Sequence, residues 1–239
     1  MPAALVTGGA VRIGRAISEA LAGDGYDVVV HYHASSDAAD ALVGEIEASG
    51  GRATAIGADL ADADQVEGLA REAAAAFGGV DVLVNNASVF PPERIEDTDA
   101  ALFDHTIAVN LRAPFLLIRH LAPALRERRG CVVNLGDLAG VQSWAGYAAH
   151  GVSKAGLLHL TRVAARSLAP EVRVNAIAPG TVLPPEELDA DEVRSLAERA
   201  PLQRNGSPDD VVRALRYLLA ADFVTGETLV VDGGRLLRG

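Results

Sequence analysis

The sequence predicts an α/β fold in which a parallel sheet is covered on both faces by helices. Short apolar runs alternate with longer amphipathic stretches along all 239 residues, and no linker, repeat or low-complexity segment interrupts the alternation. The apolar runs are nearly continuous in Val, Ile, Leu and Ala, as expected for strands buried on both faces. Strand–helix alternation of this kind indicates right-handed βαβ units. We therefore expect a single domain over residues 1–239.

The predicted elements follow one another regularly. Strands are expected at residues 3–7, 27–32, 53–58, 81–86, 131–136, 172–178 and 228–233, which gives a doubly wound, seven-stranded parallel sheet. Helices are expected at about 13–23, 36–49, 63–77, 98–128, 147–168 and 208–221. Ser207 before Pro208, and the acids Asp62 and Asp64, are typical of helix starts. Residues 182–200 are acidic, contain prolines and follow a strand, so we expect them to form a lid over an active site.

Composition disfavours several functional classes. The formal net charge of −11 argues against DNA or RNA as the main partner, because nucleic-acid binders usually carry a basic surplus. We find no apolar run long enough to cross a bilayer and no basic region typical of a signal peptide, so a cytoplasmic protein is expected. The single cysteine, Cys131, cannot form an internal disulfide, and no metal site is expected.

A glycine-rich turn follows the first predicted strand and opens a helix. In this segment, residues 7–14 (TGGAVRIG), Gly8 permits a tight turn and Gly14 permits close packing of the helix on the sheet. The helix N-terminus then presents free N–H groups to a pyrophosphate. Arg12 stands where such turns often have a middle glycine, and it would place a positive charge beside a phosphate or an anionic substrate. The turn predicts a Rossmann-type dinucleotide site.

The ends of the second and third strands bear on the choice of dinucleotide. Folds that bind NAD usually place an acid after the second strand to hold the ribose 2′-hydroxyl, but residues 31–36 (HYHASS) contain none. His33 and the serine hydroxyls would instead accommodate a 2′-phosphate, which favours NADPH over NADH. Ser36 has the alternative role of a plain helix N-cap. Asp59 would accept from the adenine amino group or cap the following helix.

Polar and small residues end the later strands. Residues 85–90 (NNASVF) follow the fourth strand, where open α/β sheets bind ligands, and Phe90 is either a core plug or an aromatic platform for a flat ring. Pro179 and Gly180 end the sixth strand, and backbone groups there suit the carboxamide of nicotinamide.

Three chemically active residue types are expected near the nicotinamide end of this cleft. Asp137 ends the fifth strand, and His150 and Lys154 are four residues apart on one helix face, with Tyr147 one turn earlier. Lys154 is the only lysine beside 20 arginines, which indicates a position that requires a compact amine. The alternative to a catalytic role for these residues is that they form an ion pair on the protein surface at the start of a helix.

Taken together, these motifs resemble those of the short-chain dehydrogenase/reductase family. The likeness covers nearly the whole chain and consists of TGGAVRIG, ADL, NNAS, Asn110, the lysine of a YxxxK motif, NAIAPG and TGETLVVDGG. Within the family the chain is most similar to pteridine reductases, through Arg12, HYHASS, the Phe of NNASVF, and Asp137 where most members have Ser. The resemblance implies a seven-stranded parallel sheet and a homotetramer.

The resemblance also implies roles for individual residues. On the cofactor side these are Gly8, Arg12, Ile13 and Gly14 for the pyrophosphate; Tyr32, His33 and Ser35 for the 2′-phosphate; Asp59 and Leu60 for adenine; and Asn86, Ala87, Ser88, Lys154, Pro179 and Gly180 for the ribose and nicotinamide. On the substrate side they are Arg12, Ser88, Phe90, Asp137 and Tyr147, with Phe90 stacking a pterin. Asn110 would anchor a proton-relay water.

One departure from the family pattern affects the expected chemistry. The catalytic Tyr of the family, four residues before the Lys, is replaced by His150. Imidazole has a reference pKa of about 6.5 against about 10 for phenol, so a charged form is accessible near neutrality. His150 is therefore one candidate proton donor, Tyr147 is a second, and loss of the donor is a third explanation.

Three functions follow from these alternatives. The first is NADPH-dependent reduction of a pterin or dihydrofolate-like substrate, with Asp137, His150, Lys154 and Asn110 as the catalytic set. The second is reduction of a carbonyl, such as a 3-oxoacyl thioester or a ketone. The third is NADP binding with weak turnover or none.

Overall fold

The computed structural model describes residues 1–184 and 188–238 and has the predicted parallel sheet. Its strands are β1 (Ala3–Val6), β2 (Asp27–Tyr32), β3 (Ala53–Gly57), β4 (Val82–Asn85), β5 (Cys131–Leu135), β6 (Arg173–Pro179) and β7 (Thr228–Val231). They pair in parallel in the order β3-β2-β1-β4-β5-β6-β7. The order reverses between β1 and β4, and this is the point where open α/β sheets bind ligands. The expected Rossmann-type fold is confirmed.

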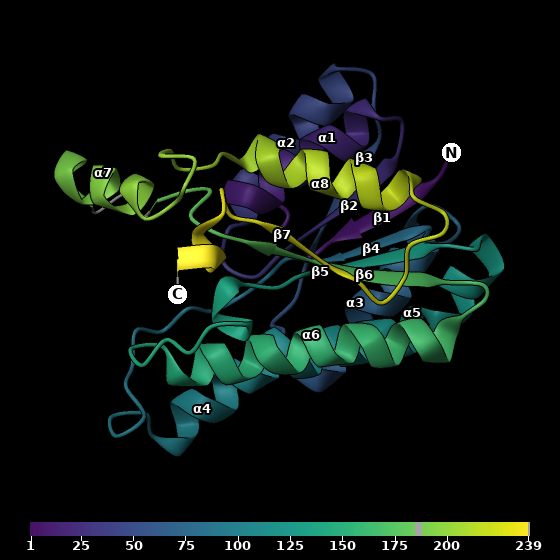
Figure 1. Ribbon diagram of the computed structural model, residues 1–239. Coiled ribbons are helices and arrows are strands. Elements are labelled where there is room, and N and C mark those ends of the chain that lie inside the picture. The colour runs from purple at the N-terminus through teal and green to yellow at the C-terminus, as the bar shows by residue number, and fades with distance from the viewer. Residues whose placement is uncertain (185–187, 239) are drawn as a thin grey trace.

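Helices cover both faces of the sheet (Figure 1). One layer consists of α1 (Arg12–Gly23), α2 (Ser36–Ala48) and α8 (Pro208–Ala220). The opposite layer consists of α3 (Ala63–Ala76), α5 (Ala113–Arg128) and α6 (Ala148–Leu168). Asp62 caps α3 by accepting from the backbone N–H groups of Asp64 and Gln65. Ser207 begins α8, and its own N–H donates to the Asp210 carboxylate at 2.8 Å.

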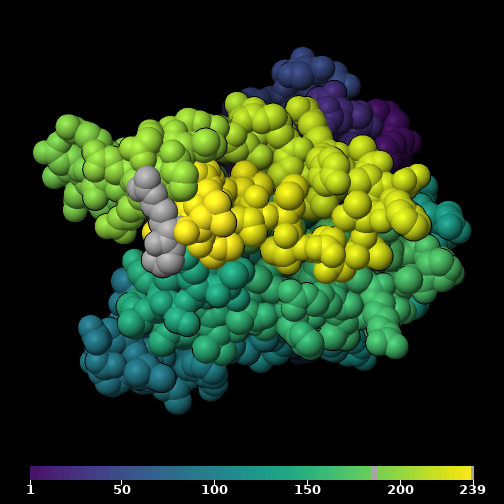
Figure 2. Space-filling view, in the orientation of Figure 1, coloured from purple at the N-terminus to yellow at the C-terminus, as the bar shows by residue number. Residues whose placement is uncertain are grey.

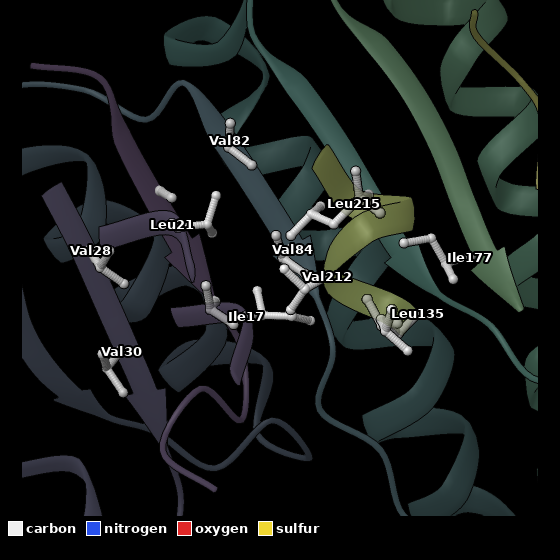
Figure 3. Close-up of a cluster of buried hydrophobic side chains, with 14 of the residues drawn as sticks. Ile17, Leu21, Val28, Val30, Val82, Val84, Leu135, Ile177, Val212 and Leu215 are labelled. Carbon is white, nitrogen blue, oxygen red and sulfur yellow. The ribbon is translucent and has the colours of Figure 1, made fainter. Parts of the chain in front are cut away.

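The strands divide their side chains between two apolar cores. Val28 and Val30 of β2 lie in the core beneath α1 and α8, whereas Val29 lies in the core beneath α3 and α5. Successive strand residues point to opposite faces, so a strand buried on both sides must be apolar at every position. Figure 3 shows the first of these cores, with Ile17 and Leu215 packed over the strands.

The helix predicted over residues 98–128 is divided in the structure. It consists of α4 (Ala100–Ile107), a π-helical turn (Ala108–Arg112) and α5. The predicted helical stretch is present, but its π turn was not predicted, because a single π turn has no distinct sequence period. Asn110 lies in this turn, and π turns are frequent at functional sites.

The same stretch also modifies the expectation about membranes. Residues 100–128 have a mean hydropathy of 1.2 in their most apolar window and are long enough to span a bilayer. In the structure Leu117, Leu121 and Leu125 of α5 are buried against the sheet and its neighbours. Packing inside the fold therefore accounts for the apolar composition.

The predicted lid contains a helix that the sequence analysis did not expect. Residues 185–187 of the segment 182–200 lie outside the described residues, and α7 (Ala190–Glu198) follows them. A capping box begins α7: Asp189 accepts from the N–H of Glu192, and Glu192 accepts from the N–H of Asp189, both at 2.9 Å. In Figure 1, α7 stands out from the body of the molecule.

Candidate active site

The glycine-rich turn has the backbone geometry that its sequence implies. Gly8 has φ +59°, and a Cβ on Gly14 would lie 2.0 Å from the carbonyl oxygen of Gly8. Arg12 also lies in the left-handed region, at φ 54°. A middle glycine adopts that conformation without strain, so this φ explains why such turns often have glycine at the position that Arg12 occupies.

The start of α1 suits a phosphate group. Val11, its N-cap residue, forms no side-chain cap, so the first N–H groups of the helix have no side-chain acceptor there. Together with the close approach of Gly8 and Gly14, these N–H groups form a cradle that fits a pyrophosphate. The Arg12 guanidinium donates to the carbonyl oxygen of Leu183 at 3.1 Å and thereby joins the turn to the predicted lid.

His31 supports the turn from below, a role that the sequence analysis missed. Its Nδ1 accepts from the N–H of Gly8, and its Nε2 lies 3.0 Å from the carbonyl oxygen of Ala58. Burial lowers the pKa of His31 to about 4. The neutral ring therefore connects the phosphate turn to the end of β3.

The residues expected around adenine and the 2′-phosphate lie beyond the ends of β2 and β3. Helix α2 begins at Ser36 with Ser35 as its N-cap residue, so the alternative that Ser36 is the N-cap was wrong. Asp59 accepts from the N–H of Ala61 at 2.8 Å, while Asp62 caps α3. Capping was therefore not the role of Asp59. The cofactor roles of Tyr32, His33, Ser35, Asp59 and Leu60 stay predictions.

The segment after β4 is fixed to the phosphate turn and to the π turn. Asn86 donates from its side chain to the carbonyl oxygens of Thr7 and Gly8, at 2.8 and 3.1 Å. The side-chain oxygen of Asn110 accepts from the N–H of Val89 at 2.8 Å, and its amide donates to the carbonyl oxygen of the same residue at 2.9 Å. Asn110 thus holds the loop that carries Ser88 and Phe90. Its expected proton-relay role stays a prediction.

A cavity of about 1530 Å³ brings most of the predicted site together. Its lining includes the expected residues Arg12, Ile13, Asn86, Ser88, Phe90, Asp137, Tyr147, His150, Lys154, Pro179 and Gly180. It also includes residues that the sequence analysis missed, among them Trp144, Thr181, Arg199 and Arg235. Four other expected residues lie outside this lining: Gly8, Gly14, Ala87 and Asn110. The predicted common crevice between the phosphate turn and the lysine-bearing helix is present.

His150 is oriented by a carbonyl group. Its Nδ1 lies 3.0 Å from the carbonyl oxygen of Val89 and 3.4 Å from the side-chain amide nitrogen of Asn110. The shorter contact is to an atom that only accepts, which favours a hydrogen on Nδ1. Nε2 is buried without a hydrogen-bond partner among the described residues and lies 3.7 Å from Oδ2 of Asp137. Nε2 is therefore the ring nitrogen available for proton transfer in the cavity.

Lys154 and Asp137 line the same cavity as this imidazole. The Lys154 side chain is 3% exposed, and its Nζ donates to the carbonyl oxygen of Leu135 at 2.7 Å. Burial lowers the pKa of Lys154 to about 8, and the Asp137 carboxylate opposes this shift. Asp137 accepts from the N–H of Ala139 at 2.7 Å through Oδ1, so its second oxygen remains directed toward His150. A surface ion pair is excluded, because His150 and Lys154 are both buried.

Phe90 is not a core plug. It is 47% exposed and stacks on Tyr147, with ring centroids 4.3 Å apart and planes inclined by 18°. Its ring meets His150 edge-on at 4.5 Å. Tyr147 is the N-cap residue of α6, and its ring packs on Phe90. His150 and Tyr147 therefore occupy different positions around the Phe90 ring.

Comparison with known proteins agrees with this geometry. The family described as Enoyl-(Acyl carrier protein) reductase matches residues 9–235. The chain is 38% identical over 237 residues to the 3-oxoacyl-[acyl-carrier-protein] reductase FabG of Staphylococcus epidermidis, with 97% of both chains covered. It is 40% identical to an uncharacterized oxidoreductase of Mycobacterium tuberculosis, covering 97% of this chain and 90% of the relative.

A solved structure is similar over almost the whole chain. FolM alternative dihydrofolate reductase 1 of Brucella suis, in complex with NADP, has a TM-score of 0.94 and 38% identity, covering 99% of this chain and 95% of that one. The chain therefore belongs to the short-chain dehydrogenase/reductase family and is an NADP-dependent oxidoreductase.

Proposed function

We propose that the protein reduces a pterin or a dihydrofolate-like compound, with His150 as the proton donor. When bound, NADPH supplies the hydride to the carbon of a C=N bond. A proton must then reach the nitrogen of that bond, so the products are the reduced pterin and NADP⁺. The observation that carries this proposal is the position of His150: the residue lines the cavity, and its buried Nε2 lies 3.7 Å from Asp137 without a hydrogen-bond partner among the described residues.

The side chains around His150 suit this transfer. The carbonyl group of Val89 fixes the ring so that Nε2, rather than Nδ1, gives up a proton. The Oδ2 atom of Asp137 lies 3.7 Å from Nε2, so a carboxylate borders the proposed donor atom. Phe90 and Tyr147 present a stacked aromatic wall against which a flat ring can pack, and Lys154 is placed to hold the cofactor ribose. Residues 182–200 would close over the substrate.

Reduction of a carbonyl substrate is the second candidate. It is favoured by the 38% identity to a 3-oxoacyl-[acyl-carrier-protein] reductase, whereas Arg12, Phe90 and Asp137 favour a pterin. The third candidate, NADP binding without efficient turnover, is favoured by the absence of the family Tyr. A substrate panel separates all three: NADPH oxidation with dihydrobiopterin or dihydrofolate supports the first, oxidation with acetoacetyl thioesters alone supports the second, and tight binding without turnover supports the third.

The donor is tested by comparing His150→Phe with Tyr147→Phe. Loss of a general acid typically lowers the rate by about 10²–10⁴-fold, so we expect His150→Phe to lower kcat by at least about 100-fold. A larger loss in Tyr147→Phe would assign the donor to Tyr147 instead. His159→Phe, an exposed histidine on the same helix, serves as the matched control and should keep the wild-type rate.

We also propose a cytoplasmic homotetramer. Phe115 of α5 and Val152 and Val163 of α6 are about half exposed, and apolar side chains on the outer surface of a helix layer suit contact with a second copy. Light scattering of the purified protein tests the assembly, and a monomer would contradict it.

A further inference from the structure

A continuous row of aromatic side chains leads from His150 to a guanidinium group. Phe90 meets His150 at 4.5 Å and stacks on Tyr147 at 4.3 Å, while Tyr147 meets Trp144 at a centroid distance of 6.1 Å. At the end of the row, the Arg235 guanidinium lies 5.3 Å from the centroid of the Trp144 ring. All five residues line the same cavity, so the row forms one of its walls.

Arg235 is held in place by a hydrogen bond. Its Nη1 donates to the hydroxyl of Thr181 at 2.7 Å. Burial and the nearby Arg199 lower the pKa of Arg235, whereas the Asp137 and Asp232 carboxylates oppose this shift. Arg199, from the end of α7, lines the cavity as well. Two like charges therefore approach each other at this end of the cavity.

The cofactor does not account for these two arginines. The residues proposed to hold the phosphates and the ribose, Arg12 and Lys154, are other members of the cavity lining. The C-terminal segment that carries Arg235 lies between α7 and the segment before α6, as Figure 2 shows in yellow, green and teal. In a chain with a net charge of −11, a locally basic wall attracts an anionic ligand that most of the surface would repel.

We propose that Arg235, together with Arg199, binds the carboxylate tail of a folate-type substrate, in which a pterin is joined to a second aromatic ring. This inference rests on the proposed function and specifies its substrate class. With the pterin against Phe90, the second ring lies along Tyr147 and Trp144, and the carboxylate reaches the guanidinium groups. Guanidinium–carboxylate pairs are strong and directional, so Arg235 would determine specificity for tailed over untailed pterins. An acyl thioester would bring an anion but no second ring.

The test compares two pterins that differ in the tail. Steady-state kinetics at saturating NADPH are measured with dihydrofolate, which carries the aryl ring and carboxylates, and with dihydrobiopterin, which carries neither. We expect Arg235→Met to raise the KM for dihydrofolate about tenfold, as for the loss of one charge-assisted hydrogen bond, and to leave the KM for dihydrobiopterin unchanged. Arg235→Lys should restore part of the affinity. Added salt should raise the KM for dihydrofolate in the wild type more than in Arg235→Met.

A second variant and a control keep the test decisive. Arg199 is exposed, so Arg199→Met should fold normally, raise the KM for dihydrofolate and leave the KM for dihydrobiopterin unchanged. Arg71, an exposed arginine of α3, supplies the matched control Arg71→Met, which should alter neither. Equal changes for both pterins, or none, would show that Arg235 only fastens the C-terminal segment and would overturn this proposal alone. Absence of wild-type turnover with either pterin would overturn the proposed function and this inference with it.

Discussion

The Nδ1 atom of His31 accepts a hydrogen bond from the backbone N–H of Gly8 at 3.0 Å, so a buried imidazole holds the phosphate turn in place. The opposite ring nitrogen, Nε2, lies 3.0 Å from the carbonyl oxygen of Ala58 and donates to it. Both contacts exist only when Nδ1 is unprotonated. The geometry of the cofactor turn is therefore coupled to the charge of one side chain that lies outside the cavity.

This coupling predicts a pH-dependent loss of stability. Burial lowers the pKa of His31 from 6.5 to about 4. Between these values the unfolded chain binds a proton that the folded protein does not, so stability falls as the pH falls. The full effect is about 3 kcal/mol, at 1.36 kcal/mol for each pKa unit. Urea unfolding of the cofactor-free protein between pH 7.5 and pH 4.5 should show this slope, and NADPH affinity should weaken over the same range.

Two variants isolate the contribution of His31. His31→Phe keeps the ring but cannot be protonated, so it should be less stable at pH 7.5 and lose less stability on acidification. His105→Phe, at an exposed histidine of α4, should keep the wild-type slope. Identical slopes in His31→Phe and the wild type would contradict the assignment.

Lys154 should lower the stability of the cofactor-free protein at neutral pH. Its amine has a pKa of about 8 when folded and 10.5 in the reference state, so below pH 8 the fold buries a charge. The contribution of Lys154 to the free energy of unfolding rises as the pH rises from about 8 to 10.5, because in this range the amine is protonated only in the unfolded chain. Lys154→Met removes the charge but also the hydrogen bond to Leu135, so we expect the free energy of unfolding at pH 7 to rise by about 1–2 kcal/mol while turnover is lost.

The measurement benefits from the presence of one lysine in the chain. Isotope-labelled reductive methylation gives a single lysine NMR signal, whose titration should report a pKa near 8. A titration midpoint close to the ordinary lysine value would contradict the expected cost. Arg166→Met, at an exposed position of the same helix, should change stability by no more than about 0.5 kcal/mol.

Gly14 should tolerate no side chain. An alanine Cβ would lie 2.0 Å from the carbonyl oxygen of Gly8 and 2.6 Å from the Asn86 amide, so the turn would have to move. We expect Gly14→Ala to destabilise the protein by at least about 2 kcal/mol and to abolish NADPH binding. Gly44→Ala, in the exposed middle of α2 with no atom within 4 Å, should instead stabilise by about 0.5–1 kcal/mol. Normal binding by Gly14→Ala, measured by fluorescence titration, would count against the cradle.

Arg12 combines a left-handed backbone conformation with a positive charge in the cavity lining. Its φ of 54° is costly for a non-glycine residue, so Arg12→Gly should leave stability unchanged or raise it by up to about 1 kcal/mol. NADPH binding should nevertheless weaken about tenfold and depend less on salt, because a positive charge beside the phosphates is lost. Arg129 has φ 50° at the exposed end of α5, so Arg129→Gly should reproduce the stability effect without the binding effect. Equal affinity in the two variants would remove Arg12 from the site.

Local sequence patterns were sufficient for the sheet and for most helices. The strands β1, β4 and β5 are buried at every position, so their apolar content is visible in four or five consecutive residues, whereas the edge strand β7 is half-buried. The π turn around Asn110 was missed because its wider winding depends on packing against α6 and the β4 loop. Helix α7 was not predicted, although Asp189 and Glu192 have the spacing of a capping box, which is a helix-start signal visible in the sequence.

Residue patterns along the chain were enough to predict the α/β fold, the phosphate turn and the unusual pairing of His150 with a lone lysine. The packed fold was needed to show that Nε2 of His150 lies beside Asp137, that His31 fastens Gly8, and that Arg235 lies over Trp144 at the end of the aromatic row. Secondary structure depends on neighbours along the chain. By contrast, the contact between His31 and Gly8 joins residues 23 positions apart, and the contact between His150 and Val89 joins residues 61 positions apart. Their geometry is fixed by the packing of the whole sheet, which no short stretch of sequence contains.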